Sequence, residues 1–227
     1  QSLSATSLVK GMRPKHLALQ LSRLAPHPCL RVELEQYATE GDLAAYWMLA
    51  VDQTDGFDGL HVVDLGSGNG ILGIAALLLG ARKVTFVETD KDALVVLHSN
   101  INSLDQPLAG QAEVIEAHIG QDELDLSSAD LIVMNPPWGV QSAKADRPFL
   151  ELAFNSNASA IHILHSEKAA HIEPLAKDNG WHWEHIIRTV FRLPPTYMHH
   201  SQRRGDTEVM CWRFHRPGDA RLPQDES

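Results

Sequence analysis

An asparagine, two prolines and a tryptophan directly follow a run of four apolar residues in the stretch "LIVMNPPWGV". The Asn135 side-chain oxygen and the Pro136 carbonyl are hydrogen-bond acceptors, and the two prolines stiffen the turn that presents them. Such a pair of acceptors can bind both N–H groups of a planar amine and favour a more nucleophilic, pyramidal nitrogen. An indole face next to them can stack on a planar acceptor. The pattern indicates methyl transfer to an amine on an sp2 carbon, such as adenine or a glutamine amide, with these catalytic residues: Asn135, Pro136, Pro137 and Trp138.

A glycine-rich loop, "VVDLGSGNGILG", lies upstream between a strand-like and a helix-like apolar run. Glycines let the backbone approach a ligand closely, and the helix N-terminus offers free N–H groups. A dinucleotide fingerprint would need glycine at position 71, where the chain has Ile71. Asp64 precedes the loop, and Glu88 ends the next strand, where a carboxylate can accept both ribose hydroxyls. The pattern therefore favours S-adenosyl-L-methionine at Asp64, Gly66, Gly68 and Glu88, and the alternative is a tight turn without a ligand.

The third expected strand, "AEVIEAH", ends near another predicted cofactor contact. His118 and the backbone of Ile119 follow that strand, where a neutral imidazole nitrogen can accept a hydrogen bond from the adenine amino group. The alternative is an ordinary surface histidine.

Strand-like and helix-like runs alternate from residue 60 onward, with short connections between them. This alternation predicts an α/β fold with a mostly parallel, doubly wound, Rossmann-like sheet, in which ligands bind at the carboxyl ends of the strands. The last two β-rich stretches, 181–194 and 206–216, suggest an antiparallel pair at one sheet edge. We expect a single domain with a helical extension over the cofactor site (1–52), a core (53–216) and a flexible tail (217–227).

The composition, with 227 residues, 44% hydrophobic and 21% charged, fits one globular domain. Cys29 and Cys211 form no CxxC pattern, and no apolar run approaches the roughly 20 residues that a membrane span needs. The start of the chain is a poor signal peptide, so a cytoplasmic location is expected. The 13 histidines include two close pairs but no zinc-like ligand set, so no metal is expected.

The net charge of -10 is unevenly distributed. Residues 1–31 carry five basic and no acidic residues, and residues 188–216 carry six arginines against two acidic residues. Residues 32–187 carry 7 basic and 24 acidic residues. The two basic ends could together form a phosphate-binding face, with solvated ends as the alternative.

Five motifs together resemble one family: "LEQYAT", "VVDLGSGNG", "MNPPWG", "HILHS" and "LPPTYMHHSQRRGDTEVMCWRF". From about Leu30 to Phe214 the chain is similar to the methyltransferase-like protein 5 family, which methylates an adenosine of small-subunit ribosomal RNA at N6. The resemblance implies a class I methyltransferase fold with a seven-stranded sheet. The first and last motifs distinguish this family from protein-glutamine methyltransferases, which share the Asn-Pro-Pro turn.

The resemblance also implies roles for individual residues. Further cofactor contacts would be Gln36 and Thr39 from the N-terminal side and Asn69 and Ile71 from the glycine loop. His118 stands where the family usually has Asp, Ala38 replaces a family Pro, and Trp138 replaces a usual Phe. RNA contacts would come from the loop "GVQSAKADRPF", a possible gate, and from the C-terminal basic loop, with these residues: Lys144, Arg147, Tyr197, His200, Arg203 and Arg204.

Family members commonly act with a small zinc-binding activator subunit that pairs through a sheet edge. The resemblance therefore implies ribosomal RNA as a substrate and such a subunit as a partner, docked near Ala112–Ala117. Two alternatives stay open. One is a protein-glutamine N5-methyltransferase that acts on a release factor, and the other is a cofactor-binding RNA assembly factor without turnover.

Overall fold

The computed structural model describes residues 14–27, 41–104, 108–138, 144–192 and 206–222. Within these ranges, helices and strands follow one another in an order close to the predicted one. The elements are α1 (Pro14–Ser22), α2 (Gly41–Thr54), β1 (His61–Leu65), α3 (Ile71–Leu78), β2 (Lys83–Glu88), α4 (Lys91–Asn102), β3 (Gln111–Glu116), β4 (Leu131–Met134), α5 (Arg147–Phe154), β5 (Ala160–Ser166), α6 (Ile172–Asp178), β6 (His182–Arg192) and β7 (Asp206–His215).

The strands form one seven-stranded sheet in the order β3-β2-β1-β4-β5-β7-β6. Strands β1 to β5 run parallel, and β7 is antiparallel to both β5 and β6. The predicted doubly wound fold, the antiparallel pair at one edge and the position of the third strand at the other edge are confirmed. The strand order reverses between β1 and β4, which is where this type of sheet binds its ligands.

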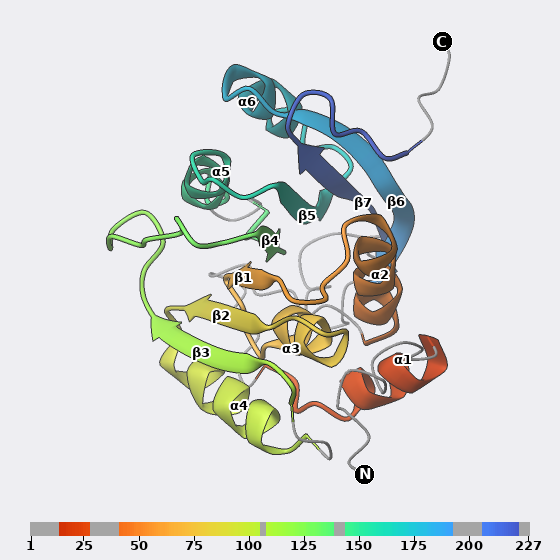
Figure 1. Cartoon of the computed structure of the whole chain (residues 1–227), viewed down its shortest axis with the longest axis vertical. Helices are drawn as coiled ribbons and strands as arrows, with labels where there is room; N and C mark the ends of the chain where they lie inside the picture. Colours follow the sequence, from red (N-terminus) through yellow and green to blue (C-terminus); the bar gives the residue numbers. More distant parts are fainter. Residues whose placement is uncertain (1–13, 28–40, 105–107, 139–143, 193–205, 223–227) are drawn as a thin grey trace.

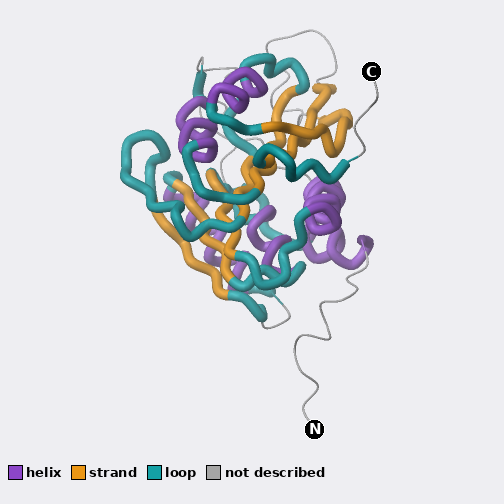
Figure 2. Tube along the Cα trace, turned by 45° about the horizontal axis from the view of Figure 1, so that its top comes forward, coloured by secondary structure: helices purple, strands orange, loops and turns teal. Residues whose placement is uncertain are grey.

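Helices cover both faces of the sheet, as Figures 1 and 2 show. Helices α1 to α4 contribute to the apolar core on one face, whereas α5 and α6 contribute to the core on the other. Strand β1 and helix α3 are buried along their whole length, which explains their nearly continuous apolar sequences. Helix α2 also belongs to the core, because Trp47, Met48 and Val51 are fully buried.

Strand β5 places two histidines on opposite faces of the sheet. Successive side chains of a strand alternate between faces, so His162 and His165, three residues apart, point in opposite directions. His162 lies on the face covered by α2, and His165 lies on the face covered by α5 and α6. Both are almost completely buried.

Three sequence-based expectations need correction. The gate loop predicted over 139–149 ends earlier, because Asp146 is the N-cap of α5 and Arg147 begins that helix. Helices α5 and α6 were not predicted at all, since each has at most eight residues and a proline. The third concerns the tail expected from residue 217, whose first residues lie against β6. The Arg221 and Leu222 N–H groups both donate to Glu184 Oε1 at 2.8 Å.

Among the described segments, no helix combines the length and apolarity that a membrane crossing requires.

Candidate active site

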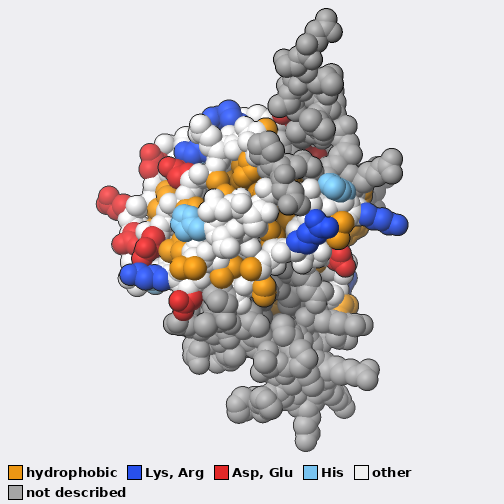
Figure 3. Space-filling model, turned by 90° about the horizontal axis from the view of Figure 1, so that it is seen from below, with side chains coloured by type: hydrophobic (Ala, Val, Ile, Leu, Met, Phe, Trp, Pro, Cys, Tyr) orange, Lys and Arg blue, Asp and Glu red, His pale blue; other side chains and the backbone are white. Residues whose placement is uncertain are grey.

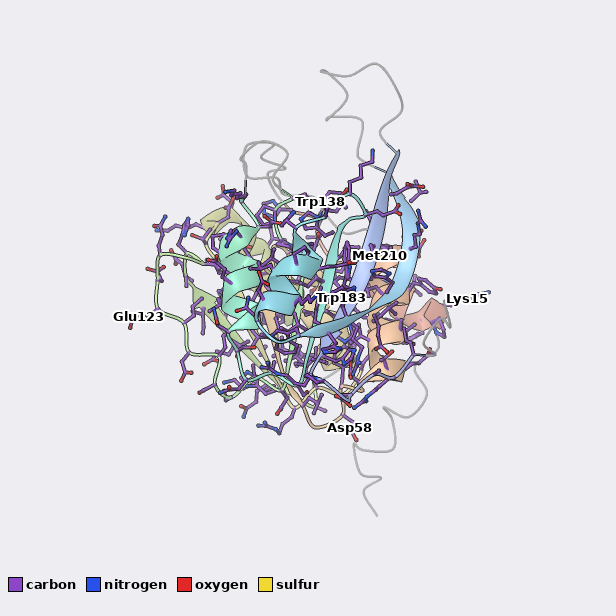
Figure 4. The ribbon with its side chains drawn as sticks, turned by 90° about the horizontal axis from the view of Figure 1, so that it is seen from above. Lys15, Asp58, Glu123, Trp138, Trp183 and Met210 are labelled. Atoms are coloured by element: carbon purple, nitrogen blue, oxygen red, sulfur yellow. The ribbon has the colours of Figure 1, made fainter. Side chains whose placement is uncertain are left out.

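The glycine loop and the Asn-Pro-Pro turn lie side by side at the carboxyl edge of the sheet. Leu65, the last residue of β1, pairs with Met134, the last residue of β4, so Gly66 and Asn135 leave adjacent strands at the same level. Figure 4 shows Trp138 at one end of the strands and Asp58 at the other. The structure therefore brings together the two motifs that the sequence predicted to act together.

The glycine loop has a backbone conformation that other residues adopt only with strain. Gly68 has a φ of 54° and Gly70 a φ of 86°. A Cβ atom on Gly70 would also lie 2.2 Å from Leu97 Cδ1, so no side chain fits there. Gly66 and Ser67 donate their N–H groups to the Val87 carbonyl, at 2.9 and 3.0 Å, which holds the loop against β2.

Asp64 lies beneath this loop with one carboxylate oxygen bound and the other unbound. The Gly73 N–H donates to Asp64 Oδ2 at 2.9 Å, whereas Oδ1 has no hydrogen-bond partner among the described residues. Burial, together with the nearby Glu88 charge, raises the pKa of Asp64 to about 7 although the hydrogen bond from Gly73 lowers it. Ser67 Oγ is also buried and without a hydrogen bond in the described part of the chain. Both orphaned oxygens suit a ligand that carries hydrogen-bond donors.

Glu88 lies at the end of β2, as predicted, and its carboxylate already accepts three backbone hydrogen bonds. Gly68 N–H donates to Oε2 at 2.8 Å, and Thr89 and Asp90 N–H donate to Oε1 at 2.8 and 2.9 Å. A carboxylate offers about four acceptor positions. Binding of both ribose hydroxyls, as predicted, therefore requires that one of these backbone bonds be released.

Trp138 contacts the Asn-Pro-Pro turn through its indole N–H. Trp138 Nε1 donates to Asn135 Oδ1 at 3.1 Å, which fixes which end of the asparagine amide carries the oxygen. The Trp138 side chain is 9% exposed, and its ring stacks on His165 with centroids 5.7 Å apart and planes at 30°. In this arrangement Trp138 supports Asn135 from within the protein rather than standing as an open platform for a substrate base.

A clamp that the sequence did not reveal joins the N-terminal segment to the glycine loop. Asn100 of α4 is 2% exposed, accepts the Ala25 N–H at 2.8 Å, and donates to the Ala25 and Asn69 carbonyls at 3.0 and 2.9 Å. Asn69 also donates to the Ala25 carbonyl at 3.1 Å. The only sequence signal was a polar Asn within an otherwise apolar helical pattern.

Comparisons with known proteins identify the family. The family model described as Conserved hypothetical protein 95 matches residues 44–177. The rRNA N(6)-adenosine-methyltransferase Mettl5 of Drosophila melanogaster is 31% identical over 81% of this chain and 87% of the relative. The chain belongs to the methyltransferase-like protein 5 family.

Solved structures agree with this assignment. A Pyrococcus horikoshii protein proposed to be an RNA methyltransferase has a TM-score of 0.77 and 32% identity, covering 91% of this chain and 97% of that one. Among the relatives found by sequence, an uncharacterized protein of Methanocaldococcus jannaschii is 28% identical over 91% of this chain and 96% of its own length. The predicted family and its class I methyltransferase fold are thus confirmed.

Other residues predicted from the family lie farther from the turn or outside the described residues. His118 is exposed after β3, where its backbone N–H donates to Asp122 at 2.6 Å, and Ile119 is buried beside it. Lys144 is exposed in a turn, and Arg147 pairs with Glu151 at 2.7 Å. Six predicted contacts lie outside the described residues: Gln36, Thr39, Tyr197, His200, Arg203 and Arg204.

The predicted C-terminal basic surface loses one of its members. Arg213 has no exposed surface, since it binds Asp55 and Glu184 inside the protein. Arg216 lies over the Trp181 ring, with its guanidinium carbon 3.7 Å from the ring centroid. Arg213 therefore cannot bind RNA, and the inference of a basic face from the whole 188–216 segment was wrong at this position.

The structure also assembles a group that the sequence analysis missed. Asp146, His165 and His171 come from α5, β5 and α6, and their ligand atoms all lie within 4.8 Å of one another. The expectation of no metal rested on the spacing of the histidines along the chain, and these three residues are well separated in sequence.

Proposed function

We propose that this protein transfers a methyl group from S-adenosyl-L-methionine to N6 of an adenosine in small-subunit ribosomal RNA. One observation carries the proposal: the Asn135-Pro136 turn leaves β4 directly beside the glycine loop that follows β1. Acceptors for an amine and a cradle for the methyl donor thus lie at the same switch point. Relatives from fly, zebrafish and nematode that are named rRNA N(6)-adenosine-methyltransferases support RNA adenine as the substrate.

The residues of the glycine loop fit the cofactor. The buried Asp64 Oδ1 can accept a hydrogen bond from a polar group of the cofactor, and Ser67 Oγ can accept or donate one. Glu88 has about one acceptor position left for a ribose hydroxyl. Gln36, Thr39, Ile71, His118 and Ile119 complete the set of contacts that we propose. When bound there, S-adenosyl-L-methionine supplies an electrophilic methyl group.

The residues of this chain contribute to the chemistry by orienting the substrate amine and by accepting hydrogen bonds from its N–H groups. Asn135 Oδ1 and the Pro136 carbonyl bind the two N–H groups of the adenine amine, which favours a pyramidal nitrogen with an available lone pair. The Trp138 indole N–H donates to the same oxygen and so fixes the direction in which the amide presents it. Because the prolines hold the turn, most of the rate gain comes from positioning.

We also propose the two partners that the family implies. Strand β3 is the last strand of the sheet on one side, and the residues described here place no strand beyond it. Such an edge can pair with a strand of a small zinc-binding activator subunit at Ala112–Ala117.

Figure 3, which views the molecule from the side of α4 and α1, shows acidic side chains gathered toward one end of that face. We assign RNA binding to the carboxyl-edge surface, with Lys144 and Arg147 as phosphate contacts, and we propose that Arg203 and Arg204, which lie outside the described residues, also bind phosphates.

The test offers the purified protein, with the activator subunit, labelled cofactor and two acceptors: ribosomal RNA and a release-factor peptide that contains glutamine. We expect N6-methyladenosine in the RNA digest and no label in the peptide. Asn135→Ala should lower turnover roughly 100-fold or more while cofactor affinity stays within about twofold. Asn157→Ala, an exposed asparagine before β5, is the matched control and should remain active.

Two results would replace the proposal. Label in the glutamine peptide instead of the RNA would assign the chain to protein methylation. RNA binding without any transfer at saturating cofactor would make it an assembly factor.

A further inference from the structure

Asp146 joins three segments at the carboxyl edge of the sheet. It is the N-cap residue of α5, and its Oδ2 lies 3.2 Å from His165 Nε2 at the end of β5. The same oxygen lies 2.5 Å from Nε2 of His171, which is the N-cap residue of α6. The side chains of Asp146 and His165 are each 2% exposed, whereas His171 is half exposed.

The backbone determines which nitrogen of His165 carries its proton. The Ser166 N–H donates to His165 Nδ1 at 2.8 Å, so Nδ1 uses its lone pair and the proton of a neutral ring is on Nε2. This proton lies on the side of the ring that faces Asp146, where Nε2 and Oδ2 are within ion-pair distance but do not meet the geometry of a hydrogen bond. Burial by itself would raise the pKa of Asp146, but the hydrogen bonds and charges of His165 and His171 hold it below its ordinary value. The carboxylate is thus ionised at neutral pH and holds both imidazoles.

The same geometry argues against a metal ion at these three residues. One aspartate and two histidines are a reasonable ligand set. A metal on His165 Nε2, however, would require the proton to move to Nδ1, where the Ser166 N–H already points. The cluster therefore suits hydrogen bonds better than metal coordination.

His165 also supports the catalytic turn. Its ring stacks on Trp138, and the Trp138 indole N–H bonds to Asn135 Oδ1. Only an oxygen can accept that bond, so the indole prevents a flip of the amide that would present its NH2 group to the substrate amine. A continuous series of contacts runs from Asp146 through His165 and Trp138 to Asn135.

We propose that His165, held by Asp146, is a positioning residue of the methyl transfer, acting through Trp138 on the orientation of the Asn135 amide. The expected effects on kcat rest on the proposed function. The expected effects on the Trp138 and Asn135 side chains rest on the described contacts alone. His165 itself touches neither substrate nor cofactor in this scheme. Loss of its contact with Asp146 lets the His165 ring move, so that the Trp138 ring tilts and its indole N–H binds Asn135 less well.

The first experiment compares Asp146→Asn with Asp55→Asn. Asp55 also binds a buried histidine, His162, but lies at the amino edge of the sheet. We expect Asp146→Asn to lower kcat roughly 10-fold to 100-fold, because small misplacements of a reacting group are costly, with cofactor affinity within about twofold. Asp55→Asn should lower the melting temperature and leave kcat of the folded protein unchanged. Equal kcat in Asp146→Asn and wild type would overturn the inference.

A double-mutant cycle separates positioning from general structural damage. Trp138→Phe keeps an aromatic ring but removes the N–H donor. If His165 acts through that donor, His165→Phe should lower kcat at least 10-fold in the wild-type chain and less than about twofold in the Trp138→Phe chain. Equal losses in both backgrounds would contradict the inference.

A readout that needs no activity keeps this inference distinct from the proposed function. In a spectrum of protein labelled with 15N-tryptophan, the Trp138 indole resonance is assigned by its loss in Trp138→Phe. We expect it to shift in His165→Phe and Asp146→Asn but not in Asp55→Asn. If the wild-type protein does not methylate RNA but the resonance shifts in the two variants, the proposed function is refuted and the positioning contact is not. An unshifted resonance, or a stoichiometric metal lost from Asp146→Asn, would refute the positioning role.

Discussion

Strand β5 carries two buried histidines that each lie against a buried aspartate, the first hydrogen-bonded and the second at ion-pair distance, and the two clusters have different surroundings. At the amino edge, His162 Nε2 lies 2.7 Å from Asp55 Oδ2. At the carboxyl edge, His165 Nε2 lies 3.2 Å from Asp146 Oδ2. The same pair of residue types thus occurs twice on one strand, on opposite faces and near opposite ends.

The amino-edge cluster contains an arginine that balances its charges. Arg213 donates to both oxygens of Asp55, at 2.8 and 2.7 Å, and to Glu184 at 2.8 Å. It also binds the Asp219 carbonyl at 2.9 Å, so the cluster ties α2, β6, β7 and the residues after β7 together. The carboxyl-edge cluster has no arginine within its described contacts and instead supports Trp138. From this difference we infer that the Asp–His pair with an arginine as third partner stabilises the fold, and that the pair next to Trp138 positions Asn135.

The largest expected effect comes from removing the arginine. Arg213→Met leaves Asp55 and Glu184 buried without their main cation, which should lower the free energy of unfolding by about 3–5 kcal/mol. Thermal unfolding should show a loss of roughly 2–4 °C for each kcal/mol in a chain of this size. kcat of the protein that remains folded should not change.

The control for this change is Arg188→Met, which removes an exposed arginine that pairs with Glu167. An exposed pair contributes under about 1 kcal/mol, so the melting temperature should hardly move. If Arg213→Met unfolded no more easily than Arg188→Met, the amino-edge cluster would not be the stabilising one of the two.

A change of intermediate size tests whether every buried polar residue at the carboxyl edge affects kcat, or only those that contact the Asn-Pro-Pro turn. Asn100 lies at that edge but holds the glycine loop and Ala25 rather than the Asn-Pro-Pro turn. Asn100→Ala should weaken cofactor binding about 10-fold, because the loop loses its clamp, while kcat at saturating cofactor changes little. Calorimetry and steady-state kinetics measure the two quantities.

Asn102→Ala, on the exposed face of the same helix, is the matched control and should bind the cofactor normally. A large loss of kcat in Asn100→Ala with unchanged cofactor affinity would show that the clamp and the Asp146 cluster do not have separate roles.

The smallest expected effect is the pH dependence of stability that comes from His162 in the amino-edge cluster. Burial lowers the pKa of His162 from 6.5, and the Arg213 charge lowers it too, although the bond to Asp55 and the charges of Asp55 and Glu184 oppose this. The unfolded chain therefore binds a proton near pH 6.5 that the folded chain resists, so stability falls as the pH drops through that region.

Urea unfolding at pH 7.5, 6.5 and 5.5 measures this loss. His162→Gln keeps a donor for Asp55 but does not titrate, so its stability should decline less than that of the wild type over the same range. An equally steep decline in the variant would assign the pH dependence to other groups.

The sequence was sufficient for the sheet because its strands are short apolar runs separated by clear breaks. All seven strands, their parallel and antiparallel parts, and the glycine loop next to Asn135 agree with the structure. Helices α5 and α6 were missed because each is only seven or eight residues long, too short for a clear helical period, and the prolines in their first turns (Pro148 and Pro174) were not recognised as helix starts.

The details of the site depended on contacts between distant segments, which sequence patterns do not contain. Asp146 and His165 meet only because α5 and β5 end at the same edge of the sheet. Trp138 was expected to offer a stacking face, but the direction of its N–H depends on packing against His165. Arg213 lies within β7, and the sequence pattern counted it with the surface arginines because it does not show that Asp55 and Glu184 surround it.

The most direct measurement is mass spectrometry of nucleosides from ribosomal RNA of cells with and without this protein. If the Asn135 turn binds the adenosine that is methylated, N6-methyladenosine in small-subunit RNA should be lost in cells without the protein. It should return with the wild-type chain or with Asn157→Ala, but not with Asn135→Ala. Unchanged N6-methyladenosine in cells that lack the protein, or full recovery with Asn135→Ala, would contradict the proposed chemistry.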